Sequence, residues 1–373
     1  MDIDMHYYGT YALARAGGLT ADAAATVAFA AEYVDDSAKE EIIHHGSGAG
    51  FVGEATAHHP TALIPNNNLD DQRRVWVPFH FLPGGEGNDL SAKLICRKDS
   101  AIAQQMVAHH LGLADAEFAL ELLGITAHVY ADTFAHYGFS GVSSRRNRVQ
   151  AGSIELVGDD PFAAEQFEAI KAFFTKYGIQ GGVFENFRKA MRAVITEGGQ
   201  AVVAALGHGA VATYPDQPYL HWTYRYENAD LWGQGAGVER DNATDFLAGS
   251  RALHGMFNRF AQKRPDVRDL RTERTFDQIA PVVTEIIGTV GPRERRWATW
   301  QARLRAGDLT GIPGEEIPAY DPEQHRREFR SLANLADSRE ARMRPIHRFQ
   351  RAAALHRNYV LRDLLPANDI ILV

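Results

Sequence analysis

The chain has 373 residues, 45% of them hydrophobic, so it can bury a substantial core in one large domain or two ordinary ones. The chain has 39 Lys and Arg residues and 47 Asp and Glu residues, which gives a formal charge of -8. This negative charge argues against a general affinity for nucleic acids or anionic membranes, and it favours a small or locally bound substrate. Cys96 is the only cysteine, which excludes an intrachain disulfide and a thiolate zinc cluster, so any metal must be held by His and carboxylate side chains.

The N-terminal stretch MDIDMHYYGTYALARAGG has acidic residues where a signal peptide needs basic ones, and no run of about 18 apolar residues occurs in the chain. We therefore expect a cytoplasmic protein without a transmembrane segment. The alanine-rich stretch Thr20–Tyr33 predicts a helix that ends at the acidic pair Asp35 and Asp36. From Ser37 to Lys98 the chain is rich in Gly, Pro, Asn and His, which predicts long ordered loops with short strands such as VWVPFHF (75–81).

Helical patterns dominate the rest of the chain. The intervening segment 207–222, GHGAVATYPDQPYLHW, predicts a proline-containing loop. After about Arg293 the chain is dense in Arg and Glu of mixed order, which is typical of solvated amphipathic helices rather than of a nucleic-acid patch. The predicted helices are Ser100–Phe139, Pro161–Tyr177, Val183–Leu206, Asn242–Ala261, Leu270–Ile287, Arg293–Arg305 and Pro322–Leu355.

These elements predict an all-α fold: a multi-helix bundle around a central metal-ligand helix, with long ordered loops and at most a short β-hairpin. Residues 1–290 are expected to form a helical metal-binding domain. Residues 291–373 are expected to form a charged helical extension packed on it.

The segment HVYADTFAH (128–136) places His128, Asp132 and His136 on one helix face, within an arc of about 80°. The surrounding sequence is apolar on nearly all sides, so the helix should be buried, and a buried Asp132 needs a cation, several donors or a metal. His128 and His136 lie roughly 12 Å apart along the axis, which favours two ions with Asp132 between them. The alternative is a hydrogen-bonded His–Asp–His ladder that only orders the core.

Further metal-capable side chains occur mostly in the predicted irregular segments and around the ends of the first helices. Taken singly, each of them could simply contact water. Together they form a set without Cys that is large enough for two or three metal ions. They are His6, Asp35, Asp36, His80, His208 and Asp216.

The segment LLGITAHVYADTFAH resembles the zinc-ligand helix of the zinc-dependent phospholipase C superfamily, particularly the catalytic domain of glycosylphosphatidylinositol-specific phospholipase D. The single-strand-specific zinc nucleases share that all-helical architecture with three zinc ions. The resemblance implies that His128 binds one ion with Asp35 or Asp36, His80 and Asp132, and that Asp132 and Asp36 take part in catalysis. It also implies a second ion at His136, His208 and Asp216, and a third at His6 and Asp132.

That superfamily uses a free N-terminal amine as a ligand. This chain begins Met-Asp, so the resemblance predicts either that Asp2 or Asp4 replaces the amine or that the third ion is absent. The opening MDIDMHYYGTYALA also resembles a bacterial family without an assigned function.

The leading functional prediction is a zinc-dependent hydrolase of phosphoester bonds, whose multinuclear His/Asp site activates water. Arg145 and Arg146 follow the ligand helix and are candidates to contact substrate phosphate; the alternative is that they belong to a solvated loop. Two other functions fit the same residues: a metal-dependent amide or ester hydrolase, and a non-catalytic helical protein with structural metal.

Overall fold

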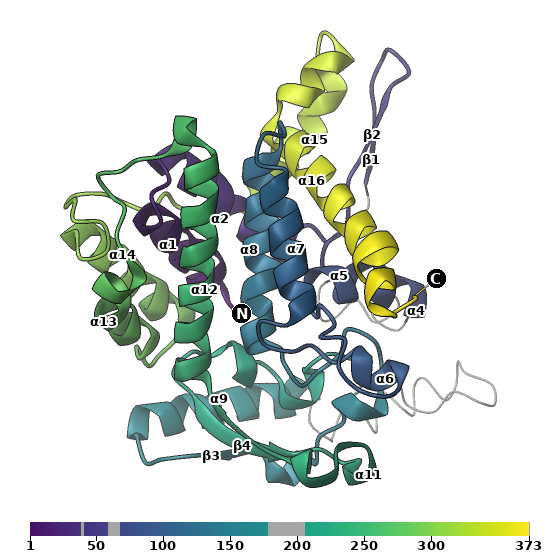
Figure 1. Cartoon of the computed structure of the whole chain (residues 1–373), viewed down its shortest axis with the longest axis vertical. Coiled ribbons are helices and arrows are strands. Elements are labelled where there is room, and N and C mark those ends of the chain that lie inside the picture. The colour runs from purple at the N-terminus through teal and green to yellow at the C-terminus, as the bar shows by residue number, and fades with distance from the viewer. Residues whose placement is uncertain (39–40, 59–67, 178–205, 373) are drawn as a thin grey trace.

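The computed structural model describes residues 1–38, 41–58, 68–177 and 206–372, and most of this part of the chain is helical (Figure 1). Helix α8, Ala119–Ala135, lies in the middle of the bundle and carries the stripe that ends at His136. The mainly α-helical fold is therefore confirmed. The longer helices that contact α8 are α2 (Ala21–Asp36), α7 (Ala101–Gly112), α12 (Asn242–Lys263) and α16 (Pro345–Tyr359).

Helices α2 and α8 approach each other closely because both present small residues at the contact. The Thr20 side chain caps α2 by accepting from the Ala23 N–H, as the sequence predicts. A Cβ atom at Gly124 of α8 would lie 2.4 Å from the Val27 carbonyl oxygen and 2.7 Å from the Ala30 Cβ. Only glycine fits there, and the backbone of α2 thereby comes within reach of the α8 side chains one turn further on.

The N-terminal segment is buried inside the molecule. Residues Asp4–Gly9 form a wide π-helical turn that continues into α1, Thr10–Ala16, and every residue of both is buried. This segment contacts α2, α8 and α14, Arg293–Ala306. Helix α13, Phe276–Ile287, joins α12 to α14 on the same side of the bundle. His6 is therefore held in the interior, beside α8.

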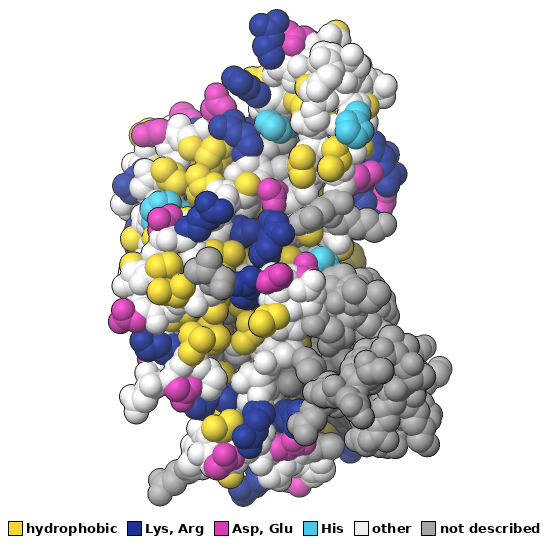
Figure 2. All heavy atoms as spheres, turned by 90° about the vertical axis from the view of Figure 1, so that its right-hand side faces the viewer, with side chains coloured by type: hydrophobic (Ala, Val, Ile, Leu, Met, Phe, Trp, Pro, Cys, Tyr) yellow, Lys and Arg dark blue, Asp and Glu magenta, His cyan; other side chains and the backbone are white. Residues whose placement is uncertain are grey.

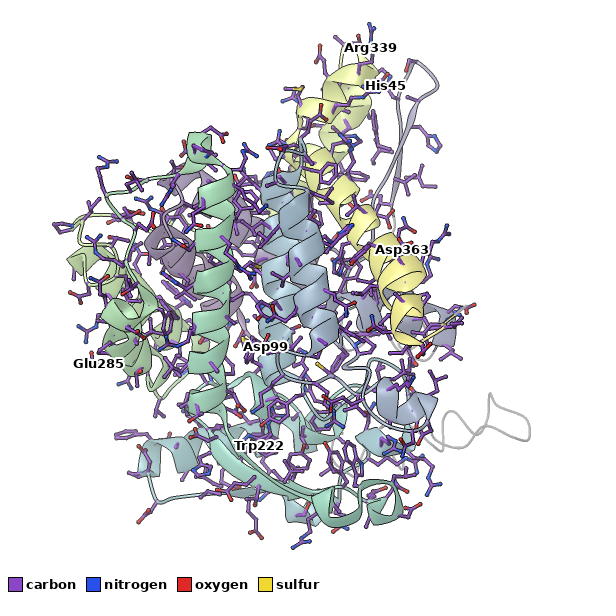
Figure 3. The ribbon with its side chains drawn as sticks, viewed as in Figure 1. His45, Asp99, Trp222, Glu285, Arg339 and Asp363 are labelled. Atoms are coloured by element: carbon purple, nitrogen blue, oxygen red, sulfur yellow. The ribbon has the colours of Figure 1, made fainter. Side chains whose placement is uncertain are left out.

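A three-stranded antiparallel sheet closes one end of the bundle, and the sequence reasoning missed it. Its order is β3 (Glu155–Leu156), β4 (His221–Arg225), β5 (Gly237–Asp241). Trp222 and Tyr224 alternate with exposed or half-buried neighbours along β4, and Figure 3 shows Trp222 on the sheet below α12. These rings build a second apolar cluster, which is separate from the main core of the bundle. The predicted loop 207–222 thus ends in a strand.

The region 37–98 holds short elements, of which one contradicts the prediction. The strands β1, Ile42–His44, and β2, Gly50–Val52, form the expected short hairpin. The predicted strand 75–81 is wrong, because Gln72–Phe79 is helical and His80 ends it. An apolar run this short fits a buried helical turn as well as a strand. The remaining short helices are α4 (Leu69–Asp71), α5 (Val77–Phe79) and α6 (Leu90–Lys93).

Several predicted helices have other bounds in the structure. The segment 100–139 divides into α7 and α8. The predicted helix 270–287 begins only at Phe276, and 322–355 divides into α15, Pro322–Ser331, and α16. The prediction for α9, Pro161–Tyr177, is confirmed. The predicted helix 183–206 lies almost wholly outside the described residues. The short helix α11, Ala229–Trp232, was not predicted.

The C-terminal region shares the main core. Trp300, Leu304, Phe329 and Phe349 belong to the same apolar cluster as residues of α2 and α8. On the face in Figure 2, basic and acidic side chains are interspersed, in keeping with the mixed charge of the sequence. Among the described residues, no helix combines the length and the apolarity needed to cross a bilayer.

Candidate metal centre

The stripe on α8 lies where other elements bring histidines and carboxylates towards it. His80 follows α5, and its ring meets His128 and Asp132. His136 ends α8, where its ring lies close to those of His208 and of Phe81. Three groups can each offer ligand atoms within 4.8 Å of one another: His80, His128 and Asp132; His136, His208 and Asp216; His6, Asp35 and His128. We call these eight residues the centre.

Four of the histidines in the centre donate one ring N–H to a backbone carbonyl, which fixes which nitrogen carries the proton in the neutral ring. The other nitrogen of each ring is then a bare lone pair that faces the centre. The donors and acceptors are His128 Nδ1 to Ala31 O at 2.8 Å, His80 Nε2 to Thr56 O at 2.9 Å, His136 Nδ1 to His80 O at 2.8 Å and His208 Nδ1 to Ala212 O at 2.7 Å.

The first group consequently brings together atoms that can only accept. His80 Nδ1 lies 3.2 Å from His128 Nε2. The Asp132 Oδ2 atom lies 3.3 Å from the His128 nitrogen and 3.5 Å from the His80 nitrogen. This buried oxygen has no hydrogen-bond donor among the described residues. Two lone pairs and a carboxylate at these distances repel one another unless a proton or a cation lies between them.

The second group has the same composition of two histidines and one carboxylate. Asp216 Oδ1 lies 3.2 Å from His136 Nε2, and its Oδ2 lies 3.7 Å from His208 Nε2. Asp216 lies in the turn Tyr214–Asp216. The side-chain amide of Asn242 donates to the carbonyl of Tyr214 in this turn and to that of Gln217 directly after it. The loop predicted from the sequence thus carries two members of the centre.

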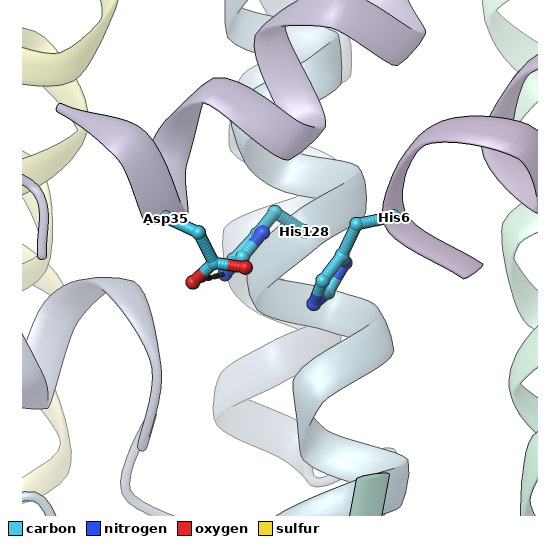
Figure 4. Close-up of side chains that lie close together, drawn as sticks. All are labelled: His6, Asp35 and His128. Atoms are coloured by element: carbon cyan, nitrogen blue, oxygen red, sulfur yellow. Dashed lines mark ion pairs between the residues drawn. The ribbon is translucent and has the colours of Figure 1, made fainter. Parts of the chain in front are cut away.

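The third group contains the most exposed side chain of the centre. Figure 4 shows His6, Asp35 and His128 converging from the N-terminal segment, the end of α2 and α8. The His6 and His128 rings stack with centroids 3.8 Å apart, and Asp35 Oδ1 lies 3.9 Å from His128 Nε2. The Asp35 side chain is 39% exposed, while the two histidines are buried. The centre is therefore open on the Asp35 side.

The α-ammonium group of Met1 lies inside the centre. Its nitrogen is 2.7 Å from Asp132 Oδ1, 3.3 Å from Asp216 Oδ1 and 3.3 Å from His136 Nε2. Burial alone would lower the pKa of this ammonium, but the charges of Asp132 and Asp216 outweigh it and raise the pKa to about 11. The prediction that Asp2 or Asp4 takes this place is wrong, because both carboxylates pair with Arg296.

The other pKa shifts reflect the balance of burial and charge. Burial lowers the pKa of His6 and of His136. Burial opposes the charged form of His80 too, but the neighbouring carboxylates of Asp132 and Asp35 raise its pKa. The Asp132 carboxyl is also buried, yet the neighbouring His136 ring and the Met1 ammonium hold its pKa well below the usual range. The centre thus stabilises one buried carboxylate and attracts positive charge.

Three predicted site residues lie elsewhere. Asp36 points away from the centre, and its Oδ2 accepts from the Tyr320 hydroxyl at 2.6 Å. Arg145 is 63% exposed and bonds to Asn228. Arg146 is buried, where it donates to Ser91, to Asp89 and to the Leu231 carbonyl. None of these three residues belongs to the groups that meet at α8 in the described part of the chain.

Comparison with known families gives one assignment. A family of unknown function, DUF6765, matches residues 1–364. The chain belongs to this family. No curated protein and no solved structure matches the chain at a significant level. The geometry described above is therefore the basis for any statement about activity.

Two features of the centre escaped the sequence reasoning. The carbonyl acceptors at Ala31, Thr56, His80 and Ala212 are backbone atoms, which leave no residue-type signal. Arg296 lies in a segment interpreted as solvated, although it is buried against Asp2 and Asp4. The pairing of two early aspartates with a distant arginine has no local pattern that would reveal it.

Proposed function

We propose that the centre binds two or three zinc ions and that the protein is a metal-dependent hydrolase, with phosphoesters as its substrate class. The observation that carries this proposal is the first group, in which two bare histidine nitrogens face Asp132 Oδ2, a buried carboxylate oxygen without a donor among the described residues. A metal ion satisfies all three atoms at once.

The chain's own residues would divide the work. His80, His128 and Asp132 would hold one ion, and His136, His208 and Asp216 another. The carbonyl hydrogen bonds keep these imidazoles in the tautomer that a metal requires and prevent their rotation. Asp132 uses one oxygen towards the first group and the other towards His6, so it is placed to connect the ions.

Zinc bound in such a site lowers the pKa of a coordinated water and offsets charge that develops on a phosphoryl group. The exposed edge at Asp35 gives a substrate access to the centre from solvent. A structural zinc site is instead enclosed by four protein ligands. This open side is the observation that favours a hydrolase over the structural alternative.

The decisive measurement is elemental analysis of protein purified without added metal. We expect two or more zinc ions per chain in the wild type and a loss of most of them in Asp132→Ala. Glu121→Ala is the matched control, because Glu121 is also a buried carboxylate of α8 but pairs with Arg348 at 2.7 Å, outside the centre. A folded wild type without metal, or equal loss in both variants, would contradict the proposal.

Activity is then tested on the zinc-loaded protein with bis-nitrophenyl phosphate and, in parallel, with a nitrophenyl ester and an amide. Turnover of the phosphodiester, abolished in Asp132→Ala and retained in Glu121→Ala, is the expected result. Turnover of the ester or amide alone would show that the bound water serves acyl rather than phosphoryl transfer. A zinc-loaded protein inactive on all three would favour structural metal.

A further inference from the structure

Arg296 is buried beside the centre with every donor of its guanidinium in use. The side chain has five N–H groups. Its Nε donates to Asp4 at 2.7 Å, one terminal nitrogen to Asp2 at 2.8 Å and to Asp4 at 3.2 Å, and the other to Gln217 Oε1 at 2.8 Å and to the Gly291 carbonyl at 3.0 Å. Arg296 itself is only 2% exposed.

Three of these partners, Asp2, Asp4 and Gln217, belong to the two chain segments that complete the centre. Asp2 and Asp4 precede His6 in the buried N-terminal turn, and His6 Nε2 lies 3.1 Å from Asp132. Gln217 directly follows Asp216, which faces His136 and His208. Arg296 comes from α14, far away in sequence, and its side chain links both segments to each other, in addition to the contact between the Met1 ammonium and Asp216.

We propose that Arg296 is a positioning residue that sets His6 and Asp216 for metal binding, an inference that rests on the proposed function. The planar guanidinium holds acceptor oxygens of four residues in fixed directions, which a single ammonium group cannot do. In both segments the guanidinium is the partner of these side chains: the Asp2 and Asp4 carboxylates are bonded to it, and the Gln217 side-chain oxygen accepts from it, while Asn242 holds the Gln217 carbonyl separately.

The group of His80, His128 and Asp132 does not depend on this link. Its histidines follow α5 and lie on α8, and they are fixed by the carbonyls of Thr56 and Ala31. Loss of Arg296 should therefore weaken the ions that need His6 or Asp216 and spare the ion of the first group. A general loss of stability would weaken all the ions alike, so selective loss distinguishes a positioning role of Arg296 from such a loss.

The test compares Arg296→Lys with Arg15→Lys. Arg15 is also a buried arginine that joins the N-terminal helix to a C-terminal segment, since its Nε lies 2.5 Å from Glu315, but Glu315 is not in the centre. Zinc content is measured while a competing chelator is titrated against each zinc-loaded protein. Arg296→Lys should lose at least one ion at a chelator concentration about 10–100-fold lower than the wild type, with one ion retained. Arg15→Lys should match the wild type.

Gln217→Met cuts only the bond towards the Asp216 segment and leaves the two aspartate pairs in place, so it tests the inference if Arg296→Lys does not fold. It should weaken one ion selectively. Equal zinc retention in Arg296→Lys, Gln217→Met and Arg15→Lys would overturn the inference while leaving the proposed function intact. A wild type that holds no zinc would overturn both.

Discussion

Among the described residues, the centre and a second cluster of histidines can be compared, and they differ in charge. The centre combines five histidines with the carboxylates Asp35, Asp132 and Asp216. The second histidine cluster consists of His109, His110 and His356, whose neighbouring rings lie 5.2–5.3 Å apart. His110 Nδ1 donates to the Thr126 hydroxyl oxygen, and His356 Nε2 donates to the Pro78 carbonyl. No carboxylate hydrogen-bonds to these three rings within the described residues.

The comparison shows that burial and unpaired nitrogens do not suffice to make a metal centre. Each ring of the second cluster has a buried nitrogen without a partner among the described residues, as the centre does at His6. Burial lowers the pKa of His110 and of His356, and no nearby anion compensates. These rings therefore stay neutral and attract no cation, whereas the carboxylates of the centre favour positive charge.

The largest expected effect is a difference in zinc content between a histidine variant in the centre and one in the second histidine cluster. His128→Leu removes a ligand shared by two of the three groups and should leave at most one zinc ion per chain. His110→Leu changes a histidine of comparable burial in the second cluster and should retain the full zinc content. Elemental analysis of both purified variants checks this. Full zinc in His128→Leu, or equal loss in both, would contradict the distinction.

The second prediction sharpens the comparison at the helix contact that positions His128. Gly124→Ala places a methyl group 2.4 Å from a backbone oxygen and 3.0 Å from a backbone nitrogen of α2, neither of which can rotate away. The helices must separate, which lengthens the His128 bond to Ala31. We expect a loss of about 3 kcal/mol in the free energy of unfolding, measured by denaturant titration, and weaker zinc binding.

Gly112 is the control for this change, because a Cβ atom there meets no other atom within 4 Å. Gly112→Ala, at the end of α7, should change stability by less than about 1 kcal/mol and leave the zinc content unaltered. A Gly124→Ala variant as stable and as zinc-rich as the wild type would show that the close approach of α2 is not needed for the centre.

The stripe on α8 was predictable because its information is local. Spacing and apolar surroundings place His128, Asp132 and His136 on one buried face, and the structure confirms that placement. The separation estimated for His128 and His136 also agrees with their membership of different groups. What periodicity cannot give is the choice between Asp35 and Asp36, since adjacent residues at a helix end point in directions that only tertiary contacts decide.

The sheet and the N-terminal anchor were missed for different reasons. Strand β4 has only five residues, and the alternation of the buried Trp222 and Tyr224 with less buried neighbours is too short to be distinguished within a mostly helical sequence. The anchor at Arg296 depends on contacts between residues far apart in the chain, 292 positions in the case of Asp4. Such contacts follow from how whole helices pack, so no window of the sequence contains them.

The last prediction concerns acid sensitivity from the second histidine cluster. Burial lowers the pKa of His356 from 6.5 to about 4, so the folded state resists a proton that the unfolded chain takes up below about pH 6.5. The contribution of neutral His356 to the free energy of unfolding is complete above that pH and falls as the pH drops towards 4. At about pH 5 the free energy of unfolding is therefore about 2 kcal/mol lower than at about pH 7.5.

The variant His356→Gln tests this, because glutamine keeps a donor for the Pro78 carbonyl but does not titrate. Its free energy of unfolding should fall by about 2 kcal/mol less over this interval. Denaturant unfolding of the wild type and of His356→Gln at the two pH values measures the difference. Both proteins are treated with a chelator first, so that loss of metal from the centre at low pH does not contribute. Equal pH dependence would mean that His356 is not held neutral by burial, and the contrast between the two clusters would then fail.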